Sequence, residues 1–164
     1  MMSAMKFRTE LSYDASPDAV FAMLSDPTFR QQVAEAQGVV SVDVRLTPRD
    51  DGFSLVSDQV QNTQGLPAIA KKITGDTTQA VVTEEWASRT QGSISITAPG
   101  KPTSATGTIS LAPDGDGTVE TVELDVKVKV PLIGGKLESL MADTIGSGYE
   151  VEHTVGRAWL KDNK

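Results

Sequence analysis

The chain contains no cysteine, so disulfides, thiolate metal sites and cysteine nucleophiles are excluded. It has a single histidine, and carboxylates alone make a poor zinc site. The Gly-rich phosphate loop, the dinucleotide-binding fingerprint and the Gly-x-Ser-x-Gly elbow of serine hydrolases are also missing from the sequence. We therefore expect neither a metal nor a cofactor.

Long apolar runs are absent as well, and no segment of the sequence has the length and apolar character needed to cross a bilayer. The first residues lack the apolar stretch of a signal peptide, and Met1, Met2 and Met5 are alternative starts. We expect residues 1–5 to form a flexible leader and residues 6–162 to form one domain of ordinary size. The expected location is cytoplasmic.

Basic charge is scarce relative to acidic charge, since 15 Lys and Arg face 22 Asp and Glu and give a formal net charge of −7. An acidic surface repels phosphate backbones and anionic lipid headgroups, which argues against nucleic acid as a partner. The lysine pairs at 71–72 and 127/129 are short and are typical of a solvated face. Aromatic residues make up only 5% of the chain, so we expect a mainly aliphatic core.

The first part of the sequence predicts one strand and two short helices. Residues 6–13 alternate between two faces with a period of two, as strands do. Ser16 followed by Pro17 is a favoured start for a helix. A Ser-Asp-Pro sequence at 25–27 repeats that signal and predicts a second short helix over 28–37.

Alternation with a period of two returns after Gly38 and predicts about six further strands separated by turn residues. These strands are expected over residues 40–46, 53–61, 77–87, 93–98, 103–111 and 118–130. The last is the clearest, because a valine- and leucine-rich face alternates with a charged face, as in an antiparallel sheet with one wet side. Residues 66–72 are ambiguous, since Pro67 disfavours a central strand.

Residues 136–161 carry apolar side chains at three- and four-residue intervals, which predicts one long C-terminal helix. Strands segregated from a covering helix indicate an α+β fold. Gly146 and Gly148 lie inside this helix, where Gly costs about 1 kcal/mol relative to Ala. Two explanations remain open for these glycines: close packing against a strand, or room for a ligand.

The order of elements resembles the START-like, or polyketide-cyclase-like (SRPBCC), superfamily. Residues 7–13 followed by Ala-Ser-Pro-Asp-Ala-Val-Phe at 15–21 look like its entry motif, a strand and then small-x-Pro-x-x-Val-Phe. Pro-Leu-Ile-Gly-Gly-Lys-Leu-Glu at 131–138 looks like an uncharacterised, largely actinobacterial branch. The resemblance covers about the whole chain. It implies a helix-grip fold, with a curved antiparallel sheet of about seven strands around a long C-terminal helix and two short helices after the first strand.

A helix-grip fold implies an internal cavity between the sheet and the C-terminal helix. The residues expected to line it are Trp86, Glu84, Ile94, Ile96, Met141, Ile145, Gly148, Glu152 and Trp159. We therefore expect a protein that binds or transports a hydrophobic small molecule or lipid. The alternatives are a cyclase- or hydrolase-type enzyme that uses a cavity carboxylate, and a protein-interaction domain that uses a sheet edge or residues 66–73.

Two carboxylates are candidates for a polar role inside this cavity. Glu152 falls on the apolar stripe of the long helix, where burial would raise its pKa and suit it to acid–base work. The alternative is a stripe-edge position in which Glu152 reaches solvent or pairs with Arg157. On the strand at 77–87, parity alone leaves open whether Glu84 or Glu85 faces inward. His153 is expected on a solvated face of the helix.

Overall fold

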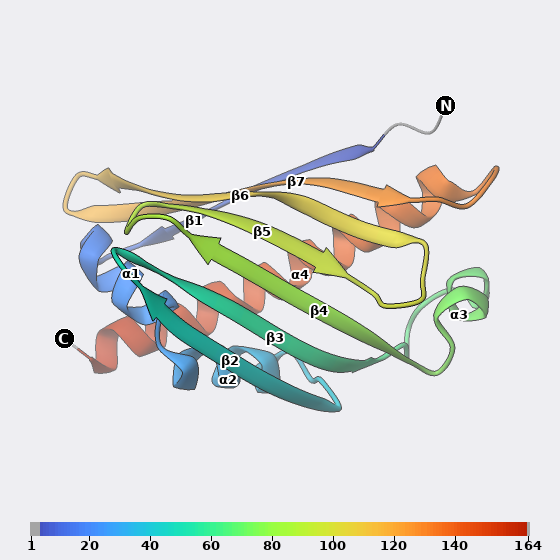
Figure 1. Ribbon diagram of the computed structural model, residues 1–164, viewed down its shortest axis with the longest axis horizontal. Helices are drawn as coiled ribbons and strands as arrows, with labels where there is room; N and C mark the ends of the chain where they lie inside the picture. The colour runs from blue at the N-terminus through green and yellow to red at the C-terminus, as the bar shows by residue number, and fades with distance from the viewer. Residues whose placement is uncertain (1–3, 164) are drawn as a thin grey trace.

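The computed structural model describes residues 4–163, and they form a seven-stranded sheet with a long helix behind it (Figure 1). The elements in chain order are β1 (Met5–Tyr13), α1 (Pro17–Leu24), α2 (Pro27–Ala36), β2 (Ser41–Arg49), β3 (Gly52–Asn62), α3 (Ala68–Thr74), β4 (Thr77–Trp86), β5 (Gln91–Thr97), β6 (Thr103–Asp114), β7 (Gly117–Val128) and α4 (Gly134–Asp162). Residues 1–3 of the expected leader lie outside the described residues, and Met5 already pairs with Val126.

The sheet is antiparallel throughout, with the strand order β1-β7-β6-β5-β4-β3-β2. Strands β2 to β7 follow one another as a meander, and β1 pairs with the last strand of that series. Helices α1 and α2 connect β1 at one edge to β2 at the other, and α4 runs diagonally behind the strands (Figure 1). The predicted α+β helix-grip architecture is confirmed, including the two short helices and the long C-terminal helix.

The two short helices begin where their capping residues predict. The Ser16 side chain accepts a hydrogen bond from the backbone N–H of Ala19, and the Asp26 side chain accepts one from Thr28. A proline follows each cap at the first helical turn, where its missing N–H costs nothing. Only two residues, Ser25 and Asp26, thus separate α1 from α2, and this short junction fixes the direction in which α2 leaves.

The ambiguous segment after β3 is a helix, α3, which begins after Pro67 and ends at Gly75 with a positive φ of 81°. Its side chain Ala70 is buried against Val128 and Leu137, in a small apolar cluster separate from the main core. Seven residues are too few for a helical period to show in the sequence, so packing rather than pattern defines this element.

The main core is aliphatic over most of its length, with Val122, Leu124 and Val126 buried as the last strand's alternation predicts. Three of the eight aromatic residues, Phe21, Phe53 and Trp86, form one cluster. Phe53 and Trp86 stack with ring centroids 5.5 Å apart, and Phe21 lies edge-on to Trp86 at 6.0 Å. This end of the molecule is therefore tightly packed. None of the helices described in residues 4–163 combines the length and apolar character that a membrane span requires.

Candidate ligand-binding cavity

A cavity of about 480 Å³ lies between the sheet and α4. Strands β3, β4 and β5 supply one wall, α4 supplies the opposite wall, and α2 and α3 contribute residues at the sides. The apolar part of the lining comes mainly from Leu55, Val82, Ile96, Met141 and Ile145. Polar side chains add to the β3 wall, among them Ser57 and Gln59.

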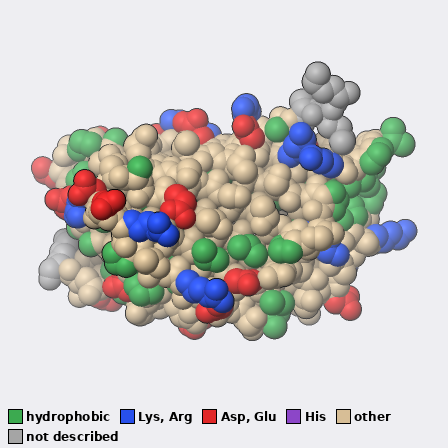
Figure 2. Space-filling model, viewed as in Figure 1, with side chains coloured by type: hydrophobic (Ala, Val, Ile, Leu, Met, Phe, Trp, Pro, Cys, Tyr) green, Lys and Arg blue, Asp and Glu red, His purple; other side chains and the backbone are tan. Residues whose placement is uncertain are grey.

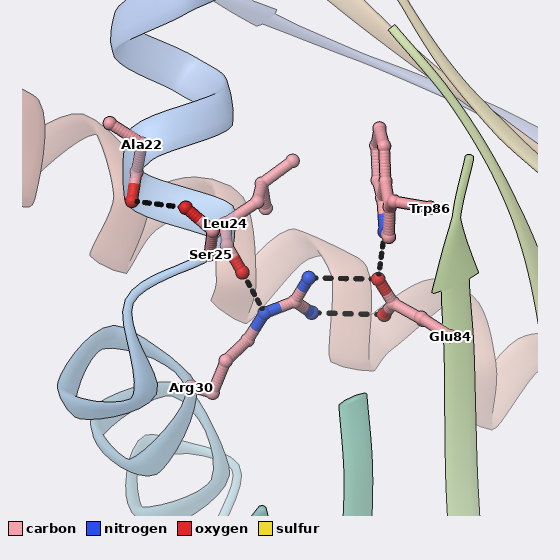
Figure 3. Close-up of polar contacts among 6 residues, drawn as sticks. All are labelled: Ala22, Leu24, Ser25, Arg30, Glu84 and Trp86. Carbon is pink, nitrogen blue, oxygen red and sulfur yellow. Dashed lines mark hydrogen bonds and ion pairs between the residues drawn. The ribbon is translucent and has the colours of Figure 1, made fainter. Parts of the chain in front are cut away.

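One end of the cavity holds a buried ion pair between Arg30 of α2 and Glu84 of β4 (Figure 3). Arg30 donates from both terminal nitrogens to the two carboxylate oxygens, at 2.9 and 2.8 Å, in a bidentate arrangement. The Arg30 Nε donates to the backbone carbonyl of Leu24 at 2.7 Å, and Trp86 Nε1 donates to Glu84 at 2.9 Å. The charge of Glu84 is therefore neutralised within the fold.

The position of Arg30 follows from the tight junction between α1 and α2. With Asp26 as the cap of α2, the residues at 29, 30, 33 and 34 form the buried face of the helix. The carbonyl of Leu24, the last residue of α1, then lies within reach of the guanidinium. Glu84 faces inward, whereas Glu85 is exposed and accepts a hydrogen bond from Ser54. The parity left open by the sequence is thereby resolved.

Glu152 of α4 is buried, lines the cavity and makes no ion pair with Arg157. Its Oε2 has no hydrogen-bond partner within the described part of the chain. Burial raises the pKa of the Glu152 carboxyl to about 7, with the charge of Arg30 lowering it and the charge of Glu84 raising it. Glu152 thus differs from Glu84, since no positive group within residues 4–163 is bonded to it.

Two further buried groups interact electrostatically with Glu152: Glu120 of β7 and Tyr13 of β1. The Glu120 Oε1 and the Tyr13 hydroxyl find no hydrogen-bond partner in residues 4–163. Burial, and then the negative charge of Glu152, raises the pKa of Glu120 well above its usual range. Burial, and then the charges of Glu120 and Glu152, also raises the pKa of Tyr13.

Three carboxyl groups therefore lie near one guanidinium, and that guanidinium is bonded to Glu84. Ionising both Glu120 and Glu152 would leave two uncompensated charges in a low-dielectric interior. Burial and this repulsion therefore raise the pKa of Glu120 and favour its protonated form, while the pKa of Glu152 is about 7. This end of the cavity can hold or release a proton.

The structure brings six of the nine sequence-derived cavity residues to the cavity and leaves three in the packed core. The six lining residues are Glu84, Ile96, Met141, Ile145, Gly148 and Glu152. Trp86 is stacked against Phe53, Ile94 is buried in the sheet core, and Trp159 lies edge-on to Phe29 at 5.5 Å. These three face inward, but neighbouring side chains fill the space in front of them.

The two helix glycines have different surroundings. Gly148 lines the cavity, and its carbonyl accepts a hydrogen bond from Gln37 Nε2 at 2.9 Å. Gly146 faces the Phe7 ring of β1, which a Cβ atom would approach to 3.5 Å. A Cβ atom at Gly146 would thus make only ordinary contact with Phe7, while Gly148 adjoins the cavity.

His153 is half-buried rather than fully solvated. Its Nε2 lies 2.8 Å from the carbonyl oxygen of Ser12, and its ring lies edge-on to Tyr13. Because a carbonyl only accepts, Nε2 carries the proton in this contact. His153 thus joins α4 to β1. Within residues 4–163, no group of three or more His, Asp or Glu side chains is placed to hold a metal ion.

The burial of Arg30 and Glu120 near Glu152 was not predicted from the sequence. Glu120 has the same parity as the buried Val122 and Val126, so the strand alternation already contained the signal. The visible face of the molecule carries acidic and basic side chains among uncharged ones, with no basic patch on that face (Figure 2). Lys71, Lys72 and Lys129 are exposed, and Lys127 is partly exposed.

Solved structures share this fold. The di-domain ARO/CYC StfQ from the steffimycin biosynthetic pathway superposes with a TM-score of 0.70 at 11% identity, over 98% of this chain and 52% of that one. A START superfamily protein from Mycobacterium smegmatis gives 0.57 at 17% identity, over 97% and 99%. The resemblance to the START-like superfamily is confirmed at the level of fold.

Sequence comparison gives the family. An uncharacterized protein of Mycobacterium tuberculosis is 24% identical over 121 residues, which cover 70% of each chain, in agreement with the expected actinobacterial branch. The family described as "Protein of unknown function (DUF2505)" matches residues 8–160. The chain belongs to this family, and its fold is the START-like helix grip.

Proposed function

We propose that the chain binds a hydrophobic small molecule or lipid in the cavity between the sheet and α4. The observation that carries this proposal is the cavity itself, with a volume of about 480 Å³ and an apolar lining. Ligand sites in proteins typically have volumes of roughly 300–1,000 Å³ and combine apolar walls with a few polar groups. The buried carboxyl of Glu152 is such a polar group.

Packing considerations support a binding role over a chance void. Protein interiors are close-packed, and few of their voids exceed the size of a water molecule. Here Leu55 and Val82 from the sheet face Met141 and Ile145 from α4 across open space. Larger side chains at these positions would occupy part of this space and add apolar contacts, so the open volume is not explained by packing.

Native mass spectrometry of the gently purified protein, with organic extraction of bound molecules, tests the proposal. An apolar molecule at near-stoichiometric occupancy supports it and identifies the ligand chemistry. In parallel, a polarity-sensitive apolar dye should bind with a stoichiometry of one and be displaced by the extracted molecule. A protein that carries no ligand and also fails to bind apolar probes would rule out the binding role.

A second candidate function is acid–base catalysis by Glu152 on a molecule held in the cavity. The observation that favours it is the pKa of about 7 of this carboxyl, since a general base works best when its pKa is near the operating pH. The extracted molecule would be returned to fresh wild-type protein and to Glu152→Gln. A product formed by the wild type alone supports catalysis, and an unchanged molecule with both proteins contradicts it.

A protein-interaction surface at residues 66–73 has less support. Leu66 and Ala70 of this segment line the cavity, and Ala70 is also buried against Val128 and Leu137. The apolar side chains of the segment are thus used within the chain. We therefore keep ligand binding as the primary proposal.

A further inference from the structure

We propose that the ligand of the cavity is a hydrophobic amine, with its protonated nitrogen bound to the carboxylate of Glu152 and its apolar part along the walls. This inference rests on the proposed binding function and specifies the ligand class. Glu152 is only 6% exposed, lines the cavity, and has an oxygen without a hydrogen-bond partner in residues 4–163. A buried polar atom of this kind requires a partner, and no side chain or backbone group of residues 4–163 is bonded to it.

The nearby cation, Arg30, is paired with Glu84. Arg30 directs both terminal nitrogens to Glu84 and its Nε to the carbonyl of Leu24. These contacts use three of the five N–H groups of Arg30, and no hydrogen bond joins Arg30 to Glu152 in residues 4–163. A ligand ammonium group would provide both the missing positive charge and the missing hydrogen-bond donors.

The charges around Glu152 select against acidic ligands. The groups that face it are Arg30 of α2, Glu84 of β4, Glu120 of β7, Tyr13 of β1 and Tyr149 of α4. They comprise one cation, which is already paired, two carboxyls and two phenols. A fatty acid carboxylate placed here would add a second negative charge beside the Glu152 carboxylate, whereas an ammonium group would neutralise Glu152.

The opposite orientation of a ligand has a recognisable signature. Lys101 is exposed and contributes to the lining at the rim of the cavity. A fatty acid could therefore bind with its chain inward and its carboxylate near Lys101. Such binding would be insensitive to the charge of Glu152, and it is an outcome that the experiment below distinguishes.

Three probes with the same apolar chain and different head groups test the inference: decylamine, decanol and decanoic acid. Their affinities would be measured by calorimetry at about pH 8, where Glu152 is mainly ionised and the amine is protonated. We expect decylamine to bind at least about tenfold more tightly than decanol, because its hydrogen bond is charge-assisted. Decanoic acid should bind most weakly. Lowering the pH to about 5.5 should reduce the affinity for decylamine, because Glu152 becomes protonated, while decanol affinity stays constant.

Two variants of α4 separate a specific role of Glu152 from a general effect of charge. In Glu152→Gln the preference for decylamine over decanol should disappear, while decanol still binds. Glu150→Gln removes an exposed carboxylate two residues away and should keep the preference. Circular dichroism would show that both variants are folded.

The outcomes separate this inference from the function on which it rests. If all three probes bind equally well, or if Glu152→Gln keeps the preference for the amine, the amine assignment is overturned and the binding function stands. Tight binding of decanoic acid that is abolished in Lys101→Gln would likewise overturn it, in favour of the opposite orientation. If no probe binds the folded protein, the binding function is overturned together with the inference.

Discussion

Arg30 and Glu84 form an ion pair unlike the others in residues 4–163. Their side chains are 9% and 3% exposed, whereas the side chains in the other ion pairs are at least 47% exposed. Exposed pairs contribute little to stability, but a buried pair whose members depend on each other becomes costly when one member is removed. The stability of the fold should therefore be sensitive to Arg30.

Replacing Arg30 with methionine should lower the free energy of unfolding by about 3–5 kcal/mol, because Glu84 would remain buried with only the Trp86 N–H as a partner. Urea denaturation would measure this loss. The double variant Arg30→Met/Glu84→Gln should recover most of it, since the amide carries no charge and still accepts from Trp86. Equal stability of the single and double variants would contradict a structural ion pair.

Glu152 should make the folded protein less stable as the pH rises through neutrality. Its pKa is about 7 in the folded state and about 4.5 as an ordinary side chain, so between these values the folded state keeps a proton that the unfolded state loses. The stabilising contribution is complete below about pH 4.5 and is lost as the pH rises through about 7, a loss of roughly 3 kcal/mol.

The raised pKa of Glu152 also predicts how the stability of Glu152→Gln differs from that of the wild type. The variant should gain stability relative to the wild type between about pH 5 and pH 8, because the amide does not ionise. Urea denaturation across this range would show the widening difference, and Glu150→Gln should follow the wild type. A difference that is independent of pH would mean that Glu152 ionises at its ordinary pKa.

Some residues of the candidate site could be predicted from sequence patterns, and others could not. The apolar stripe of the C-terminal helix predicts that Glu152 lies among apolar residues. Strand alternation identifies Glu84 and Glu85 as candidates but does not determine which of them faces inward. Arg30 lies 54 positions from Glu84, and its contact with Glu84 depends on the two-residue junction between α1 and α2. No local period encodes such a contact. The orphaned state of Glu152 likewise depends on contacts that Arg30 makes elsewhere.

The glycines of helix α4 differ in how much space the surrounding side chains leave for a Cβ atom, and the sequence does not reveal this difference. A Cβ added to Gly146 would meet the Phe7 ring at 3.5 Å, which is ordinary contact. A Cβ added to Gly156 would lie 2.8 Å from Tyr13 Cε1, 2.9 Å from its hydroxyl oxygen and 3.2 Å from Met23 Cε. Both of those neighbours are buried and have little room to move.

The two alanine substitutions should therefore have opposite signs. Gly146→Ala should stabilise the protein by about 0.5–1 kcal/mol, since alanine lowers the entropy cost of forming the helix. Gly156→Ala should destabilise it by about 1–3 kcal/mol, because the added methyl displaces Tyr13 or Met23. Urea denaturation of the pair provides its own control, and equal shifts in one direction would contradict the close approach at Gly156.

The strands and the long helix, which have a sustained hydrophobic period, could be predicted from the sequence, whereas the short helix α3 could not. The period-two alternation identified all seven strands, and the apolar stripe identified α4 to within a few residues. Helix α3 escaped because its seven residues span only two turns and its definition comes from burial of Ala70 against β7 and α4. That helix contributes to the wall of the cavity, so the shape of the site depends partly on an element that the sequence pattern does not reveal.

At the scale of the whole molecule, a net charge of −7 surrounds an interior that also has an excess of acidic groups. The long-range field attracts cations and repels anions, although salt screens it beyond roughly 10 Å. The negative net charge of the protein and the unpaired Glu152 carboxyl in the cavity thus both favour a cationic ligand. The apolar walls determine how much of a ligand can be buried, and the volume of the cavity sets the limit.

Filling the cavity should separate ligand binding from folding. Ala80 of β4 is buried and lines the cavity, so Ala80→Phe would place an aromatic ring in open space, where its burial adds apolar contact. A ligand that binds only the folded state raises the free energy of unfolding, by about 2.7 kcal/mol at a hundredfold excess over Kd. With decanol as the probe, the wild type should show this increase in urea denaturation and Ala80→Phe should not. Val81→Phe changes the neighbouring residue on the opposite face of the strand and should respond as the wild type does. An equal response of Ala80→Phe and the wild type would place the ligand outside the cavity.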